Sequence, residues 1–325
     1  MSKLRVLSLF SGIGAFEKAL TNIGIDYDLV NYCEFDKYAS KSYSLIHNVS
    51  EDMNLGDITK VNENDLPECD LITYGFPCQS FSVQGKKLGF KDKEKGGLFF
   101  ETMRVARKLK PKYLIAENVK NLVSHDNGNT FSTILATLDD IGYNNYYKVL
   151  NSVDYGVPQR RERIFIISIR KDLDDGTFEF PEQIPLNIRV KDIIDFEYKE
   201  RHIKESLRPY LDSKYHKEFK SKDFIVKVFD GVSQGYFKSS FSQNRIYSIE
   251  GTCPTLTTGY DSPVFLEIGG LLNSKERFLL QGFTEEDYYK VEGHILERQL
   301  AKQAGNSISV NVLEHIFKNL FVNNK

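Results

Sequence analysis

The chain has 325 residues, with 43 Lys and Arg against 45 Asp and Glu, a formal net charge of −2, and 41% hydrophobic residues. This composition excludes a disordered or fibrous chain, and the length fits one large domain or a large and a small one. No run of about 18 apolar residues and no signal-peptide pattern occurs, so we expect a cytoplasmic protein without a membrane partner.

Short apolar runs alternate with amphipathic stretches through the first 170 residues. The expected strands are 5–10, 29–33, 70–74, 113–117, 146–153 and 163–169, and the expected helices are 16–23, 37–47, 98–109 and 131–141. This order predicts an α/β fold with a doubly wound, mostly parallel sheet covered by helices on both faces.

The pattern changes after about residue 185. Residues 186–289 contain short β-rich pieces, 224–229 and 245–249, between clusters of Gly, Ser and Asn, which is typical of a smaller, irregular β-rich domain. Helical spacing returns at 311–320. Four cysteines lie far apart without a C-x-x-C pair, so we expect no metal site and no disulfide framework.

Two glycines, Gly12 and Gly14, fall in the turn between the first expected strand and its helix. Glycines there allow a tight turn and let main-chain N–H groups approach a nucleotide-like ligand. Glu34 follows 20 residues after Gly14, where an acid can accept hydrogen bonds from ribose hydroxyls, and Asp57 can do similar work. The set favours an adenosine-type cofactor, either a nicotinamide nucleotide or S-adenosylmethionine. Glu17 replaces the third glycine of the dinucleotide pattern.

The segment Y-G-F-P-C-Q-S-F-S follows the strand expected at 70–74. Carboxyl ends of parallel strands line the ligand crevice of a doubly wound sheet, so Cys78 is aimed at the expected cofactor site. Pro77 restricts Phe76 to extended geometry and stiffens the loop. No His is adjacent, which excludes the local signature of a Cys/His hydrolase. We therefore interpret Cys78 as a reactive thiol.

Two further polar groups lie at ends of expected strands. Glu117 ends the strand at 113–117, where a carboxyl group can donate a proton or bind a base, or cap a helix. Gln159, Arg161 and Arg163 share one face of an extended segment. An Arg set of this kind is usually a surface or ion-pair feature, but its position at this end of the sheet favours contact with substrate.

In the order and separation of these blocks, the chain resembles the cytosine-5 DNA methyltransferase family, of the compact bacterial type. The blocks are F-S-G-I-G near the N-terminus, Glu34, G-D-I at 56–58, G-F-P-C-Q-S-F-S, E-N-V at 117–119, Q-x-R-x-R at 159–163, L-Q-G-F at 280–283 and Q-A-G-N-S at 303–307. The resemblance extends over nearly the whole chain. It implies a DNA (cytosine-5-)-methyltransferase with a Rossmann-like methyltransferase domain at 1–185 plus 290–325 and a target-recognition domain at 186–289.

The resemblance also implies roles for individual residues. Cys78 would add as thiolate to C6 of a flipped cytosine, and Glu117 would contact N3 and the exocyclic amine of that base. Arg163, with Arg161, would hold the base. S-adenosylmethionine, the only cofactor implied, would be bound by Phe10, Gly12, Gly14, Glu34, Asp57, Ile58, Phe76, Pro77, Leu98, Asn306 and Ser307. Duplex DNA would be contacted by Ser82, Gln84, Arg245 and Thr255.

The resemblance further implies a monomer without metal, whose restriction-modification setting allows a cognate endonuclease that acts on the same site without binding the enzyme. A nicotinamide-dependent oxidoreductase is one alternative, but it leaves Cys78, Glu117 and Arg163 without a shared purpose. A tRNA cytosine-5 methyltransferase of the same family is another. Residues 82–112 contain 10 basic and 3 acidic side chains, whereas residues 1–79 contain 6 basic and 12 acidic ones. The net charge of the whole chain is therefore near zero although one segment is basic and suited to DNA.

Overall fold

The computed structural model describes residues 3–77, 97–217, 219–220, 224–238, 244–259, 261 and 263–323. Its contacts divide the chain into two compact units. The first unit is Met1–Leu150, Glu162–Pro181 and Glu314–Lys325, and the second is Asn151–Arg161 and Glu182–Leu313. These units group 151–161 and 290–313 with the expected small domain. The division by function into 1–185 plus 290–325 and 186–289 stays a prediction.

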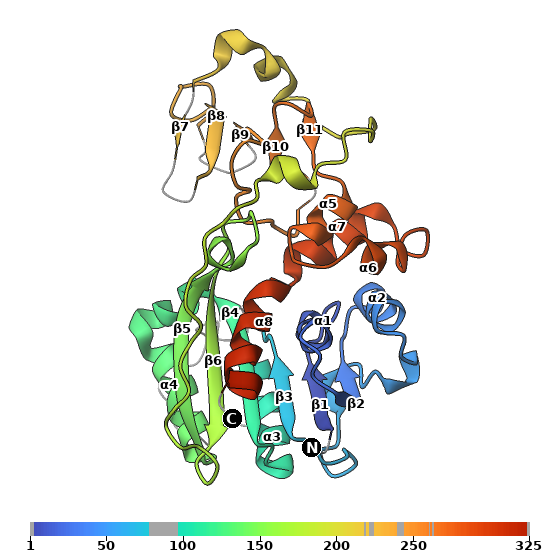
Figure 1. The fold of residues 1–325 in the computed structure, drawn as a ribbon, viewed down its shortest axis with the longest axis vertical. Coiled ribbons are helices and arrows are strands. Elements are labelled where there is room, and N and C mark those ends of the chain that lie inside the picture. Colours follow the sequence, from blue (N-terminus) through green and yellow to red (C-terminus); the bar gives the residue numbers. More distant parts are fainter. Residues whose placement is uncertain are drawn as a thin grey trace. The chain divides into compact units, whose positions relative to one another are not determined.

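The first unit is built on a six-stranded sheet with the order β2-β1-β3-β4-β6-β5 (Figure 1). The strands are β1 (Leu4–Leu9), β2 (Tyr27–Cys33), β3 (Leu71–Tyr74), β4 (Tyr113–Val119), β5 (Tyr143–Asn151) and β6 (Glu162–Arg170). The pairs β1–β2, β1–β3 and β3–β4 are parallel, whereas β4 and β6 are antiparallel. The sheet is therefore mostly parallel, as expected. Because β2 and β3 lie on opposite sides of β1, the strand order reverses there, and this is where doubly wound sheets bind ligands.

Helices cover both faces of this sheet. They are α1 (Ala15–Asn22), α2 (Lys37–His47), α3 (Leu98–Leu109), α4 (Asn129–Asp140) and α8 (Val310–Lys318), the last continued by a π-helical turn over Asn319–Asn323. Alternate strand residues such as Leu7 and Leu9 belong to one buried cluster with Met103 of α3 and Leu138 of α4. On α1, Phe16 contacts Phe317 at 6.4 Å between ring centroids. The chain pattern thus gives the doubly wound architecture.

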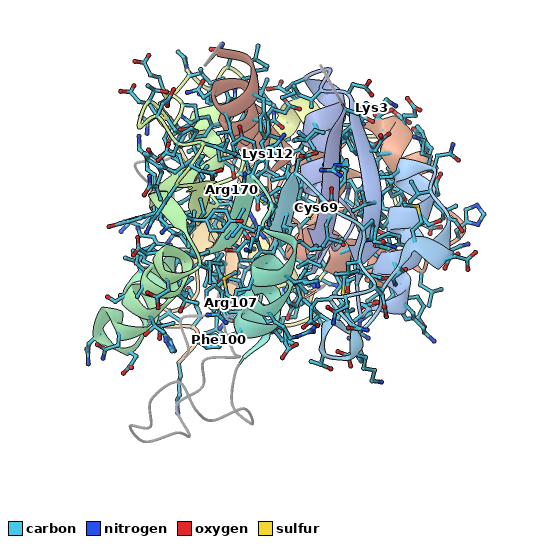
Figure 2. All side chains as sticks on the ribbon, turned by 90° about the horizontal axis from the view of Figure 1, so that it is seen from below. Lys3, Cys69, Phe100, Arg107, Lys112 and Arg170 are labelled. Atoms are coloured by element: carbon cyan, nitrogen blue, oxygen red, sulfur yellow. The ribbon has the colours of Figure 1, made fainter. Side chains whose placement is uncertain are left out.

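Ion pairs lie at the end of the sheet where β1, β3 and β4 begin. Asp70 accepts hydrogen bonds from the main-chain N–H and the Nε of Arg5, and Lys112 Nζ lies 3.2 Å from its Oδ1. Burial alone would raise the pKa of Asp70. The hydrogen bonds from Arg5 and Lys112 lower it to about 2. Figure 2, seen from below, labels Lys112, Arg170 and Cys69 in this region. The opposite, carboxyl edge is left for the site.

The second unit contains a five-stranded sheet and three short helices. Its strands, in the order β11-β10-β9-β8-β7, are β7 (Phe219–Lys220), β8 (Val226–Asp230), β9 (Arg245–Tyr247), β10 (Val264–Phe265) and β11 (Gly270–Leu271). The helices are α5 (Ser274–Leu279), α6 (Glu285–Tyr289) and α7 (Glu297–Asn306). Capping boxes formed by Asn273 with Glu276 and by Thr284 with Asp287 begin α5 and α6. The small β-rich sheet confirms the expected fold class, whereas the three helices were not predicted.

Among the described residues, none of the helices has the length and apolar character needed to cross a membrane. The same residues contain no group of three or more His, Cys, Asp or Glu side chains placed to hold a metal ion.

Candidate functional site

The loop after β1 presents main-chain groups at the carboxyl edge of the sheet. Phe10, Gly12 and Gly14 all have positive φ, at 54°, 57° and 80°. A Cβ atom at Gly14 would lie 1.9 Å from Nε2 of His47, so a side chain there collides with α2. At Gly12, no described atom lies within 4 Å of the Cβ position. The collision requires glycine at position 14, whereas at position 12 the positive φ favours glycine and the empty space leaves that face open to a ligand.

Glu34 reaches the glycine loop from the end of β2. Its Oε2 accepts a hydrogen bond from the N–H of Gly12 at 2.8 Å, and its Oε1 accepts one from the N–H of Asp36 at 2.7 Å. Burial raises the pKa of Glu34, and the hydrogen bonds from Asp36 and Gly12 oppose that rise. Two main-chain donors thus fix the direction of this carboxylate. The acid predicted from its 20-residue separation does lie against the loop.

Asp57 caps a short 3₁₀ turn, Ile58–Lys60, which packs against α3. Asp57 Oδ1 accepts hydrogen bonds from the Thr59 hydroxyl at 2.8 Å and the Thr59 N–H at 3.0 Å, and these bonds lower the pKa of Asp57. Ile58 is buried in the core cluster, and its carbonyl accepts a hydrogen bond from Arg104. Gly56 is tied to β2 because its carbonyl accepts a hydrogen bond from the thiol of Cys33 at 3.1 Å.

The end of β3 leads to the predicted nucleophile. Phe76 is buried, with its ring 5.3 Å from that of Phe99, and its carbonyl accepts a hydrogen bond from Asn118 Nδ2 at 2.7 Å. Pro77 is exposed, and Leu98 is half-buried at the start of α3. Three predicted site residues, Cys78, Ser82 and Gln84, lie outside the described residues. The role of Asn118 was missed, although it lies inside the E-N-V block.

Glu117 and Arg163 form an ion pair between neighbouring strands. Arg163 Nε lies 3.0 Å from Glu117 Oε1, and the two side chains are 16% and 11% exposed. The antiparallel register of β4 and β6 sets Arg163 opposite Val119, so its guanidinium reaches back diagonally along the same face. The other oxygen of the carboxylate, Oε2, lies 3.8 Å from the Cβ position of Gly75. The carboxyl group is therefore oriented beside the strand end that precedes position 78.

Arg161 and Gln159 bind main-chain groups of the second unit. The guanidinium of Arg161 is buried and donates to the carbonyls of Leu256, Gly305 and Ser307 at 3.1, 3.1 and 2.6 Å. Gln159 donates to the carbonyl of Leu280 and accepts from the N–H of Leu256. The partners named here for both side chains lie in the second unit, whereas Arg163 meets Glu117 in the first. Bonds of this kind hold separate main-chain segments together. A catalytic role for Arg161 stays a prediction.

The remaining predicted residues of the second unit are spread over its surface and core. Asn306 is exposed at the end of α7, and Ser307 after it is buried. The hydroxyl of Thr255, an exposed residue, donates to the carbonyl of Arg160 at 2.6 Å. The Nε of Arg245 donates to Oδ2 of Asp230 at 3.1 Å.

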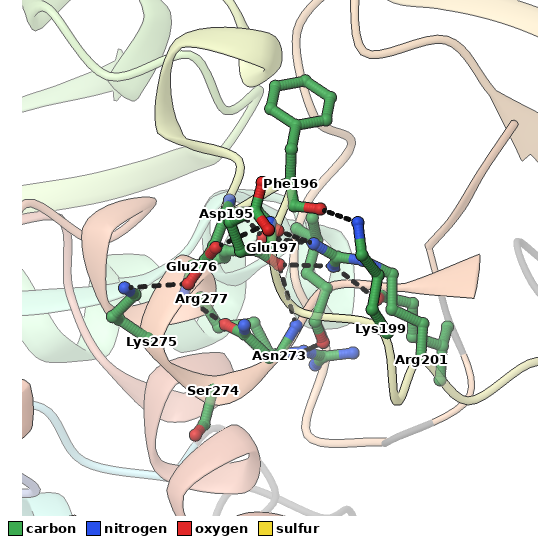
Figure 3. A network of polar contacts seen from close by, with 12 residues as sticks. Asp195, Phe196, Glu197, Lys199, Arg201, Asn273, Ser274, Lys275, Glu276 and Arg277 are labelled. Atoms are coloured by element: carbon green, nitrogen blue, oxygen red, sulfur yellow. Dashed lines mark hydrogen bonds and ion pairs between the residues drawn. The ribbon is translucent and has the colours of Figure 1, made fainter. Parts of the chain in front are cut away.

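A buried ion pair that the sequence did not reveal anchors residues 195–201 to α5 (Figure 3). Both terminal nitrogens of Arg201 donate to the two oxygens of Glu276 at 2.8 Å, and the side chains are 5% and 0% exposed. Glu276 also accepts hydrogen bonds from the N–H groups of Asn273 and Asp195. Arg201 donates in addition to the carbonyl of Asp195. Every oxygen of this carboxylate is thus engaged within the second unit.

Comparison with known proteins matches residues 4–322 to the family described as C-5 cytosine-specific DNA methylase. The type II methyltransferase M.HhaI of Haemophilus parahaemolyticus is 38% identical over 328 residues, covering 98% of this chain and 95% of that protein. The orphan methyltransferase M.SPBetaI of Bacillus phage SPbeta is 35% identical over 438 residues and covers 98% of each.

Two solved structures share the fold over the full length. The Dnmt2 methyltransferase of S. pombe superposes with a TM-score of 0.70 at 19% identity, covering 99% of both chains. The Entamoeba histolytica methyltransferase EhMeth gives a TM-score of 0.71 at 16% identity and covers 100% of both. At these identities the likeness is one of fold alone.

Proposed function

The chain belongs to the C-5 cytosine-specific DNA methylase family and is a methyltransferase, and from this we propose that it transfers a methyl group from S-adenosylmethionine to C5 of a cytosine in a specific sequence of duplex DNA. The observation that carries the proposal is the Glu117–Arg163 ion pair beside Gly75, three residues before Cys78. A carboxyl group fixed at that strand end is what a neighbouring nucleophile needs to act on a cytosine ring.

The residues at the carboxyl edge fit an adenosine-type methyl donor. The open face of Gly12 offers room at the start of α1, and Glu34 offers carboxylate oxygens to ribose hydroxyls. Phe35, beside Glu34, is 80% exposed and offers its ring to a base. S-adenosylmethionine bound there would supply the methyl group. The residues proposed to hold it are Phe10, Gly12, Gly14, Glu34, Asp57, Ile58, Phe76, Pro77, Leu98, Asn306 and Ser307.

The chain's own residues would perform the remaining chemistry. The thiol of Cys78 loses its proton and forms a bond from Sγ to C6, which makes C5 electron-rich. Glu117 accepts a hydrogen bond from the exocyclic amine and, when protonated, donates one to N3, while Arg163 orients that carboxyl group and stabilises negative charge on the ring. After methylation a base removes the C5 proton, and Sγ leaves C6. Arg161, by its contacts, would support this site by bracing the chain.

We propose that the substrate is duplex DNA in the cytoplasm and that the enzyme acts as a monomer without metal. Extruding the cytosine costs a few kcal/mol, which protein contacts must offset. Residues 186–289 would recognise the target, with Ser82, Gln84, Arg245 and Thr255 contacting DNA. Methylation would protect DNA from a restriction endonuclease that reads the same site.

Bisulfite sequencing of plasmid DNA tests this proposal. Plasmids from cells that express the wild-type chain are expected to keep unconverted cytosines at one sequence context, and plasmids from cells expressing Cys78→Ser are not. A parallel methyl-transfer assay offers duplex DNA and tRNA to the purified chain. Identical conversion in the two plasmids, or transfer to tRNA alone, would contradict the proposed substrate.

A further inference from the structure

The segment that leads to Gly56 lies along the outer edge of β2 as an added strand. Tyr32 and Asn54 form an isolated parallel bridge, and the N–H of Leu55 donates to the carbonyl of Tyr32 at 2.7 Å. The side chain of Asn31 donates to the carbonyl of Met53 at 3.1 Å. Residues 53–56 are therefore held beside the strand end that carries Glu34.

The side-chain amide of Asn54 binds the main chain of Glu34 on one side and that of Gly56 on the other. Its Oδ1 accepts hydrogen bonds from the N–H of Glu34 at 2.9 Å and the N–H of Gly56 at 3.0 Å. Its Nδ2 donates to the carbonyl of Glu34 and to Oγ of Ser40, both at 2.9 Å. Main-chain donors on one side and a main-chain acceptor on the other leave a single orientation for the amide.

Two of these four bonds fix the main chain of Glu34, one at its N–H and one at its carbonyl. The Glu34 carboxylate is separately held by the N–H groups of Gly12 and Asp36. Asn54 also sets the position of Gly56, which precedes Asp57. Since the main chain of Glu34 depends on this amide, a change at Asn54 moves the acid that would face the ribose without removing it.

We propose that Asn54 is a positioning residue for ribose recognition, which holds Glu34 where its carboxylate can reach the sugar hydroxyls of the cofactor. This inference rests on the proposed function. Asn54 does not touch the cofactor in this role. It acts through Glu34, so its loss affects cofactor selectivity before it affects the chemistry.

The test compares the full-length wild type with Asn54→Ala, Asn54→Asp and the control Asn31→Ala, which removes one bond to the same segment but none to Glu34. Steady-state methyl transfer gives kcat and the KM values for S-adenosylmethionine and DNA. Calorimetry gives the preference for S-adenosylhomocysteine over its 2′-deoxy analogue. Asn54→Ala is expected to raise the cofactor KM by about tenfold and to lower the ribose preference by a similar factor. The DNA KM and kcat should stay within about twofold.

Asn54→Asp keeps the oxygen that accepts from the two N–H groups, so it is expected to lose less than Asn54→Ala, and Asn31→Ala is expected to match the wild type. If Asn54→Ala does not fold, the ribose preference of Asn54→Asp decides. A ribose preference unchanged in the Asn54 variants, with normal wild-type binding, overturns this inference alone. A wild-type chain that binds no S-adenosylhomocysteine overturns the proposed function as well.

Discussion

Arg163 and Glu117 meet at 3.0 Å across the one antiparallel pairing of β4 in the first unit's sheet. Because β6 runs opposite to β4, the beginning of β6 lies beside the end of β4, and an Arg near the start of one strand reaches an acid near the end of the other. The mixed direction of the sheet is thus what places a cation on the candidate catalytic carboxyl group.

Replacing Arg163 should lower the rate of methyl transfer more than it lowers substrate affinity. Arg163→Ala is expected to reduce kcat by about 10²–10³, because the Glu117 carboxylate loses its orienting donor and developing charge on the ring loses a cation. Arg163→Lys keeps the charge without the planar fork and should recover part of that loss. Steady-state kinetics with saturating DNA and cofactor provide the measurement. A kcat for Arg163→Ala within about twofold of wild type would contradict the role.

Glu17 predicts a loss of stability as pH rises. Burial raises the pKa of Glu17 from 4.5 to about 7, so the folded chain binds the proton more tightly than the unfolded chain. The stabilisation is therefore complete below about pH 4.5 and is lost as pH rises through about 7, a change of about 3 kcal/mol. Urea unfolding of the wild type and of Glu17→Gln at pH 5 and pH 8 measures it.

The neutral amide of Glu17→Gln removes this titration, and the two tyrosines whose pKa the Glu17 charge raises, Tyr27 and Tyr43, stay protonated at both pH values. The variant should match the wild type closely at pH 5 and exceed its stability at pH 8. Parallel pH profiles for the two chains would show that Glu17 does not carry the effect.

Much of the first unit could be predicted from the sequence because local signals and burial agree there. The helix ranges 37–47 and 98–109 match α2 and α3 residue for residue. Asp36 caps α2 by accepting hydrogen bonds from the N–H groups of Tyr38 and Ala39. At the end of α3, Lys110 adopts a φ of 49° ahead of Pro111. Such signals act over a few residues and are visible in the chain itself.

The short helices of the second unit could not be predicted by hydrophobic period. α5 and α6 have six and five residues, too few for a repeating apolar face, and they begin at capping boxes. The sequence also could not predict that Arg161 and Arg163 bind different partners. Their spacing of two residues predicts one shared face of an extended segment, whereas the tertiary structure gives Arg161 three carbonyls and Arg163 a carboxylate.

The buried pair of Arg201 and Glu276 should dominate the stability of the second unit. Glu276→Gln leaves the Arg201 charge buried without its counter-ion, and the expected loss is about 3–5 kcal/mol in the free energy of unfolding. Glu205→Gln removes the partner of Arg208 from a pair that is 78% and 59% exposed, so it should change stability by less than about 1 kcal/mol. Urea unfolding compares the two variants. Equal effects would mean that burial does not govern the Arg201 pair.

Phe35 should contribute to cofactor affinity through its ring. It is 80% exposed between two residues whose main chains are fixed, since Glu34 donates its N–H to Asn54 and Asp36 donates its N–H to Glu34. The Cα–Cβ bond of Phe35 therefore has a set direction at the carboxyl edge, and its exposed ring is free to stack on adenine for about 1–3 kcal/mol. Phe35→Ala should raise the KM for S-adenosylmethionine by about tenfold or more, and Phe35→Trp should preserve it. Phe196→Ala, at a ring 53% exposed in the second unit, is the matched control and should leave that KM unchanged. If Phe35→Ala and Phe196→Ala gave the same cofactor KM as the wild type, Phe35 would be an exposed ring without a ligand.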